Sequence, residues 1–136
     1  MLKKIFNRYL FYFIYCILIF PSVILIFKNI QPKNVAALFA GGVFISCSLL
    51  IIIGEYFWER PRWARSLSLV AALIFLGAFS LPMIVMRAVY FSTAFEELTI
   101  LFMSAPVFHR NSNFAYIALM ICILINYFQK LFSQKP

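Results

Sequence analysis

The sequence predicts an all-α protein that spans a membrane four times, as a single transmembrane domain over residues 1–136. The first observation behind this prediction is composition: 65% of the residues are hydrophobic and 12% are charged, whereas soluble domains have roughly 45–50% and 25%. A soluble domain of this size could not bury so much apolar surface. The second observation is pattern, because four long apolar runs alternate with short polar segments. These runs cover approximately residues 9–27, 35–54, 66–86 and 114–132.

The first run, Tyr9–Phe27, follows the bases Lys3, Lys4 and Arg8. As a helix it would be roughly 28 Å long, close to the thickness of the hydrocarbon layer. The run is longer than the apolar region of a signal peptide, and no small-residue cleavage site follows it. We therefore expect an uncleaved membrane anchor.

The second run, Val35–Gly54, is rich in small residues and is expected to be the centre of helix packing. Ala37 and Gly41 are four positions apart, and so are Gly42 and Ser46. Small residues at this spacing let two helix backbones approach closely in lipid. The sequence therefore predicts helix contacts at these four residues.

The third and fourth runs are Ser66–Met86 and Phe114–Phe132. Pro82 is expected to kink or loosen the last turn of the third helix, because proline removes a backbone hydrogen bond. Near the end of the fourth run, Lys130 can extend its ammonium group to the membrane interface.

The polar turn between the second and third runs, Glu55–Arg65, is predicted to lie in the cytoplasm. Its charges permit two interpretations. The first is a docking patch for a cytoplasmic partner. The second, which is favoured, is that the charges only solvate and orient the turn. The candidate docking residues are Glu55, Glu59, Arg62 and Arg65.

The segment Ala88–Phe108 is apolar but carries Glu96 and Glu97 at its centre, so it could be a fifth span or an interfacial helix. With four spans, eight of the twelve Lys and Arg residues lie on the side that holds both termini and four on the other; with five spans, seven lie on the side of the N-terminus and five on the other. The positive-inside rule thus favours four spans and cytoplasmic termini. We expect an amphipathic interfacial helix over approximately residues 88–105, ended by Pro106. Its apolar stripe would be Phe91, Phe95, Leu98, Phe102 and Ala105.

One group of polar residues lies in the outer loop, between the third and fourth runs. Its members are Arg87, Glu96, Glu97, His109 and Arg110. Such a group could bind a phosphate headgroup or transfer protons. The plainer interpretation, which we favour here, is that the arginines flank the spans and the glutamates form the wet face of the interfacial helix.

Several classes of chemistry have no support in the sequence. The centres of the four runs contain no acid, base or histidine, which argues against an ion-coupled transporter. Cys16, Cys47 and Cys122 lie in separate runs, without the spacing of metal ligands or redox pairs. No motif for a phosphate loop, a nucleophile or a zinc protease is present. The sequence predicts no catalytic residue, no metal site, no cofactor and no nucleic-acid partner.

Two functions remain open. The first is a small protein of the bacterial inner membrane that acts through helix contacts, as an accessory subunit or as an immunity-type protein. Its partner would be another membrane protein or a second copy of the chain, in contact with membrane lipids. The alternative is a translocase or transfer component for a lipid or lipid-linked substrate, which would use the charged outer loop.

Overall fold

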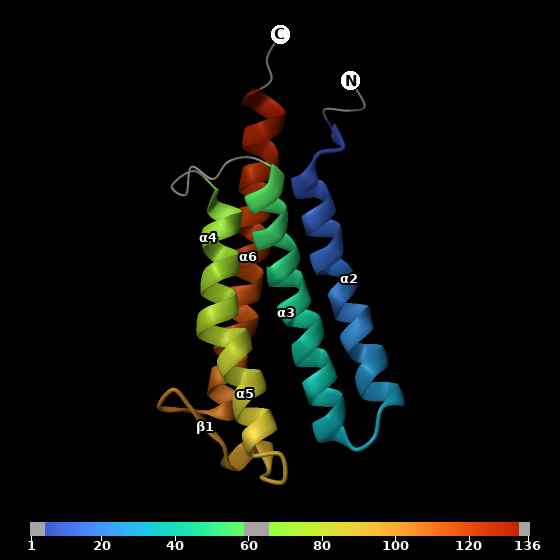
Figure 1. The fold of residues 1–136 in the computed structure, drawn as a ribbon, viewed down its shortest axis with the longest axis vertical. Helices are drawn as coiled ribbons and strands as arrows, with labels where there is room; N and C mark the ends of the chain where they lie inside the picture. Colours follow the sequence, from blue (N-terminus) through green and yellow to red (C-terminus); the bar gives the residue numbers. More distant parts are fainter. Residues whose placement is uncertain (1–4, 59–65, 134–136) are drawn as a thin grey trace.

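The computed structural model describes residues 5–58 and 66–133 of the chain. Within these two ranges, four helices are long and apolar enough to cross a membrane, so the prediction of four spanning helices is confirmed. Figure 1 shows them as one elongated bundle. They are α2 (Arg8–Asn29), α3 (Lys33–Trp58), a third helix composed of α4 (Leu67–Ile74), η1 (Phe75–Ser80) and α5 (Leu81–Val89), and α6 (Ala105–Ser133).

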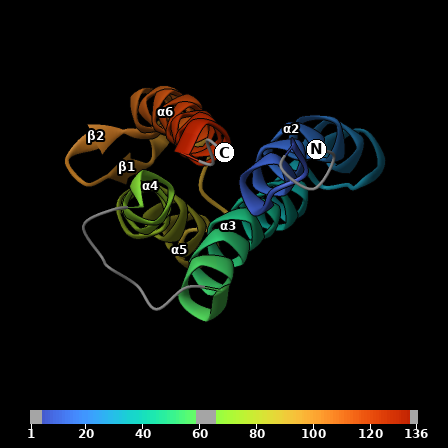
Figure 2. The same ribbon diagram turned by 90° about the horizontal axis from the view of Figure 1, so that it is seen from above.

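The bundle consists of two pairs of helices. We group the consecutive helices α2 and α3 as one pair and the third helix and α6 as the other; α3 also packs along the third helix, and α6 along α2 (Figure 1 and Figure 2). The start of α2 and the end of α6 lie at the same end of the bundle, which we call the terminal end. The connection from α5 to α6 lies at the opposite end, which we call the hairpin end. The core between the pairs includes the buried side chains of Cys16, Ile19, Cys47, Ile51, Phe75, Tyr116, Leu119 and Ile123.

Side-chain hydrogen bonds join α6 to the other helices. Near the middle of the bundle, the Tyr116 hydroxyl donates to the Cys16 carbonyl oxygen at 2.7 Å. Nearer the terminal end, the Asn126 Oδ1 atom accepts from the backbone N–H of Ser68 at 2.8 Å and from the Ser68 hydroxyl at 2.6 Å. Because each bond of this kind contributes only about 0.6 kcal/mol in a membrane, they orient the helices more than they stabilise them.

The fourth helix begins earlier than the sequence predicted. α6 starts at Ala105 instead of Phe114, so that His109 and Arg110 are helical. Pro106 was expected to end a helix, and that expectation is wrong because it lies in the first turn of α6. The backbone N–H groups of a first helical turn have no acceptor within the helix, so proline is well tolerated there.

The third helix contains a π-helical segment, η1, between α4 and α5. Pro82 follows directly as the second residue of α5, so the predicted irregularity lies one turn earlier than expected. π-Helical turns inside α-helices are rare and occur frequently at functional sites.

The structure does not form the predicted amphipathic helix over residues 88–105. α5 ends at Val89, and the chain continues through a 3-10 turn into a two-stranded antiparallel hairpin. The burial pattern gives the reason, because Leu98 and Ile100 are buried while Thr99 between them is exposed. This alternation is that of a strand. The elements concerned are η2 (Phe95–Glu97), β1 (Thr99–Ile100) and β2 (Met103–Ser104).

The turn of this hairpin is strained. Its two central residues, Leu101 and Phe102, have φ angles of 47° and 66°. Two-residue hairpin loops favour this left-handed conformation, but they usually place Asn and Gly there. For residues with a Cβ atom the conformation costs roughly 1–2 kcal/mol each, so the surroundings of the hairpin must hold it in place.

A buried ion pair connects the helices at the terminal end. The Arg8 Nε atom lies 2.7 Å from the Glu55 Oε1 atom, and both side chains are largely buried. The other carboxylate oxygen of Glu55 accepts hydrogen bonds from the hydroxyls of Tyr9 at 3.2 Å and Ser66 at 3.0 Å. Ser66 also caps α4, since its hydroxyl accepts from the Leu69 backbone N–H. One carboxylate on α3 thus contacts α2 and the start of the third helix.

This geometry bears on the candidate docking patch. Glu55 is a residue of α3 and is 5% exposed, so its carboxylate faces the interior of the bundle. Glu59, Arg62 and Arg65 lie outside the described residues. A docking role for these residues remains a prediction.

Replacing Glu55 by Gln is expected to lower the free energy of unfolding by roughly 2–3 kcal/mol, because it removes the charge that compensates the buried guanidinium of Arg8. The measurement is denaturant-induced unfolding of the protein in lipid nanodiscs, followed by circular dichroism. The control is Glu97→Gln, which neutralises an exposed carboxylate and should change stability by no more than about 0.5 kcal/mol. Equal effects of the two substitutions would contradict the structural role of the ion pair.

Candidate functional site

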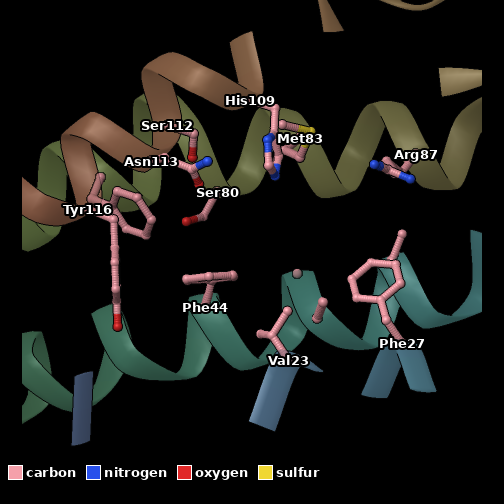
Figure 3. A pocket seen from close by; sticks show the side chains of 14 residues that line it. Val23, Phe27, Phe44, Ser80, Met83, Arg87, His109, Ser112, Asn113 and Tyr116 are labelled. Atoms are coloured by element: carbon pink, nitrogen blue, oxygen red, sulfur yellow. The ribbon is translucent and has the colours of Figure 1, made fainter. Parts of the chain in front are cut away.

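A cavity of about 100 Å³ lies between the two helix pairs, towards the hairpin end of the bundle. Figure 3 shows that its two sides differ: polar side chains project from α5 and α6, and apolar side chains face them from α2 and α3. The residues that line the cavity include Val23, Phe27, Ala37, Ala40, Gly41, Phe44, Ser80, Met83, Arg87, His109, Ser112, Asn113 and Tyr116.

Helical spacing explains the polar side contributed by α6. His109, Ser112, Asn113 and Tyr116 are three, four and seven positions apart, so they lie on one face of the helix. This face exists only because α6 begins at Ala105. His109 and Asn113 are exposed and form the rim of the cavity, whereas Tyr116 is buried at its inner end.

The third helix supplies the rest of the polar side. Ser80, Met83 and Arg87 are three and seven positions apart, so they form a similar row facing α6. Ser80 is the last residue of the π-helix η1, and Arg87 lies in the last turn of α5. The guanidinium of Arg87 is charged at any physiological pH and carries five N–H donors.

The apolar side owes its hollow shape to small residues on α3. Ala37, Ala40, Gly41 and Phe44 share a face of this helix and line the cavity. A Cβ atom added at Gly41 would lie 3.3 Å from the side chain of Ile84 on the third helix, which is a tight contact. The small residues Ala37, Ala40 and Gly41 therefore let the two helix pairs approach while leaving room between them.

The predicted helix-packing residues are thus in different surroundings. Ala37 and Gly41 face the interior, next to the cavity. The Ser46 hydroxyl and the Tyr15 hydroxyl form a hydrogen bond of 3.0 Å between α3 and α2. Gly42 differs from these, because an added Cβ atom would meet nothing within 4 Å.

The hydroxyl of Ser80 has no hydrogen-bond partner among the described residues, and the residue is buried, with only 6% of its surface exposed. Its side chain points into the cavity (Figure 3). A buried hydroxyl without a partner costs roughly 1–3 kcal/mol, and such groups in native proteins call for an explanation. A polar group of a ligand in the cavity would supply the missing hydrogen bond.

Phe95 of η2 packs against two residues that line the cavity, Arg87 and His109. The Arg87 Cζ atom lies 4.2 Å from the centroid of the Phe95 ring. The His109 ring meets the same Phe95 ring edge to face, with 6.1 Å between centroids. The neighbouring residue, Glu96, interacts electrostatically with Arg87. The segment between α5 and α6 thus both shields Arg87 and partly balances its charge.

The five residues predicted from the outer loop fall into two groups. Arg87 and His109 come together at the cavity, and Glu96 lies near Arg87. Glu97 and Arg110 are exposed and do not line the cavity. Sequence reasoning missed the polar residues Ser80, Ser112, Asn113 and Tyr116. Their spacing can be seen in the sequence. It places them at one cavity only if α6 begins at Ala105 and the third helix contains the π-helical turn.

The cavity is suited to an anion. Arg87 donates hydrogen bonds only, and Ser80, Ser112 and Asn113 can each donate as well. No acidic side chain is among the residues that line this cavity. A phosphate or carboxylate group here could accept charge-assisted hydrogen bonds, which are about twice as strong as neutral ones.

Comparisons of this chain with protein-family models, with curated proteins and with solved structures find no match. Its function is therefore argued from the geometry of the cavity.

Replacing Phe95 by Ala is expected to uncover more of the imidazole of His109, which is already exposed but packs edge to face against the Phe95 ring. The measurement is the rate of acylation of His109 by diethyl pyrocarbonate, read by mass spectrometry. His109 is the single histidine of the chain, so the site of reaction is unambiguous. The rate should rise several-fold in Phe95→Ala. The control is Phe91→Ala in the same segment, and a similar rise in this control would contradict a specific cover by Phe95.

Proposed function

We propose that this protein binds the anionic headgroup of a membrane amphiphile in the cavity, as a translocase or transfer component for a lipid or lipid-linked substrate. The observation that supports this proposal best is the buried hydroxyl of Ser80, which lacks a hydrogen-bond partner within residues 5–58 and 66–133 and points into a cavity that Arg87 and His109 also line. A phosphate group has several acceptor oxygens for such donors.

The contrast between the two sides of the cavity supports an amphiphile over a fully polar ligand. The headgroup would lie against α5 and α6, where the donors are. The first carbon atoms of the ligand's hydrocarbon chain would lie against Val23 and Phe27 of α2 and Phe44 of α3. An inorganic anion would leave this apolar surface without a complementary partner.

Cavity size supports the same proposal. A volume of about 100 Å³ is well below the range of roughly 300–1,000 Å³ for pockets of drug-sized ligands. The cavity is thus suited to a single phosphate group. A ligand with a long apolar chain would keep most of that chain in the bilayer.

The proposal includes an orientation. We place the terminal end in the cytoplasm, because most of the basic residues of the sequence belong to that side, and the membrane would be a bacterial inner membrane. The cavity then lies in the outer half of the bilayer. The segment from η2 to β2 lies at the outer interface, where its movement would admit a headgroup.

The first test uses dodecyl phosphate as the probe and the full-length protein in phosphatidylcholine nanodiscs. Removing the guanidinium in Arg87→Gln is expected to weaken binding about tenfold, which corresponds to roughly 1.4 kcal/mol. Ser80→Ala should weaken it several-fold through the loss of one hydrogen bond. Affinities are measured by microscale thermophoresis, with dodecyltrimethylammonium and inorganic phosphate as comparison ligands.

The matched control for Arg87 is Arg110→Gln, which removes the same charge from an exposed residue outside the cavity. Its affinity for dodecyl phosphate should stay within a factor of about two. If both arginine variants weaken binding equally, the attraction is a general effect of charge and the cavity is not the site. Equal binding of dodecyltrimethylammonium would show that the dodecyl chain and not the anionic headgroup is recognised, and it would contradict the proposal as well.

A second function is favoured by one observation at Gly42. This residue is exposed on α3, and nothing lies within 4 Å of the position that its Cβ atom would take. A glycine on a lipid-facing helix surface allows another helix to approach closely. It therefore supports the proposal that the protein acts through helix contacts, as an accessory subunit or an immunity-type protein with a membrane-protein partner.

The two glycines of α3 test this second function. Gly42→Leu should leave the thermal stability of the purified protein in nanodiscs unchanged, because the added side chain meets open space. It should, however, abolish association with a partner helix, measured as the loss of co-purifying protein from native membranes. Gly41→Leu should instead destabilise the protein itself, through its contact with Ile84. An unaltered set of co-purifying proteins in Gly42→Leu would refute the helix-contact function.

A further inference from the structure

The hairpin β1–β2 carries its largest apolar side chains at its tip. Phe102 is 101% exposed and Leu101 is 55% exposed. The base of the hairpin is in the opposite situation, since Leu98 and Ile100 are buried in a small core with Ala105 and Phe108 of α6. The body of the bundle thus holds the base, while the tip contacts no part of the described chain closely enough to cover it.

The hairpin projects sideways from the bundle. Both views show it extending away from the third helix and α6 on the side remote from α2 (Figure 1 and Figure 2). Since β2 runs directly into the first residue of α6, the hairpin lies at the level of that helix end. A helix of 29 residues is roughly 43 Å long, longer than the hydrocarbon layer of about 30 Å. The start of α6 therefore lies near the headgroups.

The distribution of charge around the hairpin agrees with a position near the headgroups. No residue from Leu98 to Phe108 is charged. Glu96 and Glu97 precede this stretch, and His109 and Arg110 follow it. Polar and charged groups thus lie at the base, next to the bundle end, and the uncharged tip extends laterally from it. This arrangement is that of an element whose tip enters the interfacial region and whose base stays hydrated.

We propose that the β1–β2 hairpin is a membrane-interface anchor, with Leu101 and Phe102 inserted among the headgroups and the first carbon atoms of the lipid chains. The partner is the lipid surface beside the bundle. It supplies an apolar environment for two side chains that the turn presents outward at the cost of an unfavourable backbone conformation. The anchor does not depend on the binding of an amphiphile in the cavity.

The test places a tryptophan at the tip and determines its depth. The chain carries Phe102→Trp in a background without its two native tryptophans, Trp58→Phe and Trp63→Phe, and is reconstituted alone in nanodiscs. Fluorescence is quenched with lipids brominated near the headgroup end or near the tail end of their chains, and with aqueous iodide. We expect the first lipid to quench roughly twice as strongly as the second, because interfacial elements lie about 5–10 Å deep, and iodide to quench weakly.

A matched variant and a second probe keep the result interpretable. Glu97→Trp in the same background lies at the exposed base and should be quenched by iodide. Leu101→Trp should repeat the result of Phe102→Trp, in case one substitution disturbs the turn. Strong iodide quenching at both tip positions would place the tip in water and overturn the proposal. Protection from both iodide and bromine would show that protein covers the tip, in a second copy of the chain, and would overturn it as well.

Discussion

The carboxylate of Glu55 is the group on which the arrangement of the terminal end depends. It contacts Arg8 and Tyr9 of α2 and the Ser66 cap of α4, so it connects three helices within a few ångströms. In lipid, where apolar surface gives no preference for one helix neighbour over another, such a contact specifies which helices meet. Replacing a buried ion pair by apolar residues often costs little, so we attribute to this one specificity of arrangement more than net stability.

The distribution of such contacts explains where the cavity lies. The bond from Tyr116 to Cys16 and the bonds between Asn126 and Ser68 lie between the middle and the terminal end of the bundle. At the hairpin end, the helix pairs are joined through a loop, where Asn34 donates to the Phe91 carbonyl oxygen. Small residues of α3 face the polar residues of the other pair in this region. Side-chain hydrogen bonds between helices thus gather between the middle and the terminal end, and the cavity lies towards the hairpin end.

The number and approximate position of the helices could be predicted from the sequence, because apolar length is a strong local signal. Two features could not be predicted: the end of the second helix near Glu55 and the structure of the segment around Leu98. Glu55 looks like part of a polar turn until Arg8, far away in the sequence, is seen beside it. The segment around Leu98 and Ile100 matches both a helical stripe and an alternating strand, and only its packing against Phe108 decides between them. In each case the deciding contact is non-local.

The candidate site was partly predictable for the same reason. Arg87 and His109 could be chosen by chemistry alone, since charged groups beside a span are few. Ser80 and Ser112 are ordinary residues in the sequence, and their possible role appears only when the structure brings both to the polar side of one cavity. The grouping of Glu97 and Arg110 with them rested on proximity along the chain, and the structure separates these residues from the cavity.

The π-helical turn η1 has a consequence for the phase of the third helix. Before it, the buried residues Ser68, Ala72 and Phe75 are four and three positions apart, as one face of an α-helix requires. From Phe75 to the next buried residue, Ser80, the step is five, after which the spacing returns to three and four at Met83 and Arg87. The turn thus accommodates one additional residue. Without it, α5 would be rotated by roughly 100°, and the row that ends at Arg87 would face lipid. The polarity of the cavity therefore depends on a phase shift produced by a single residue.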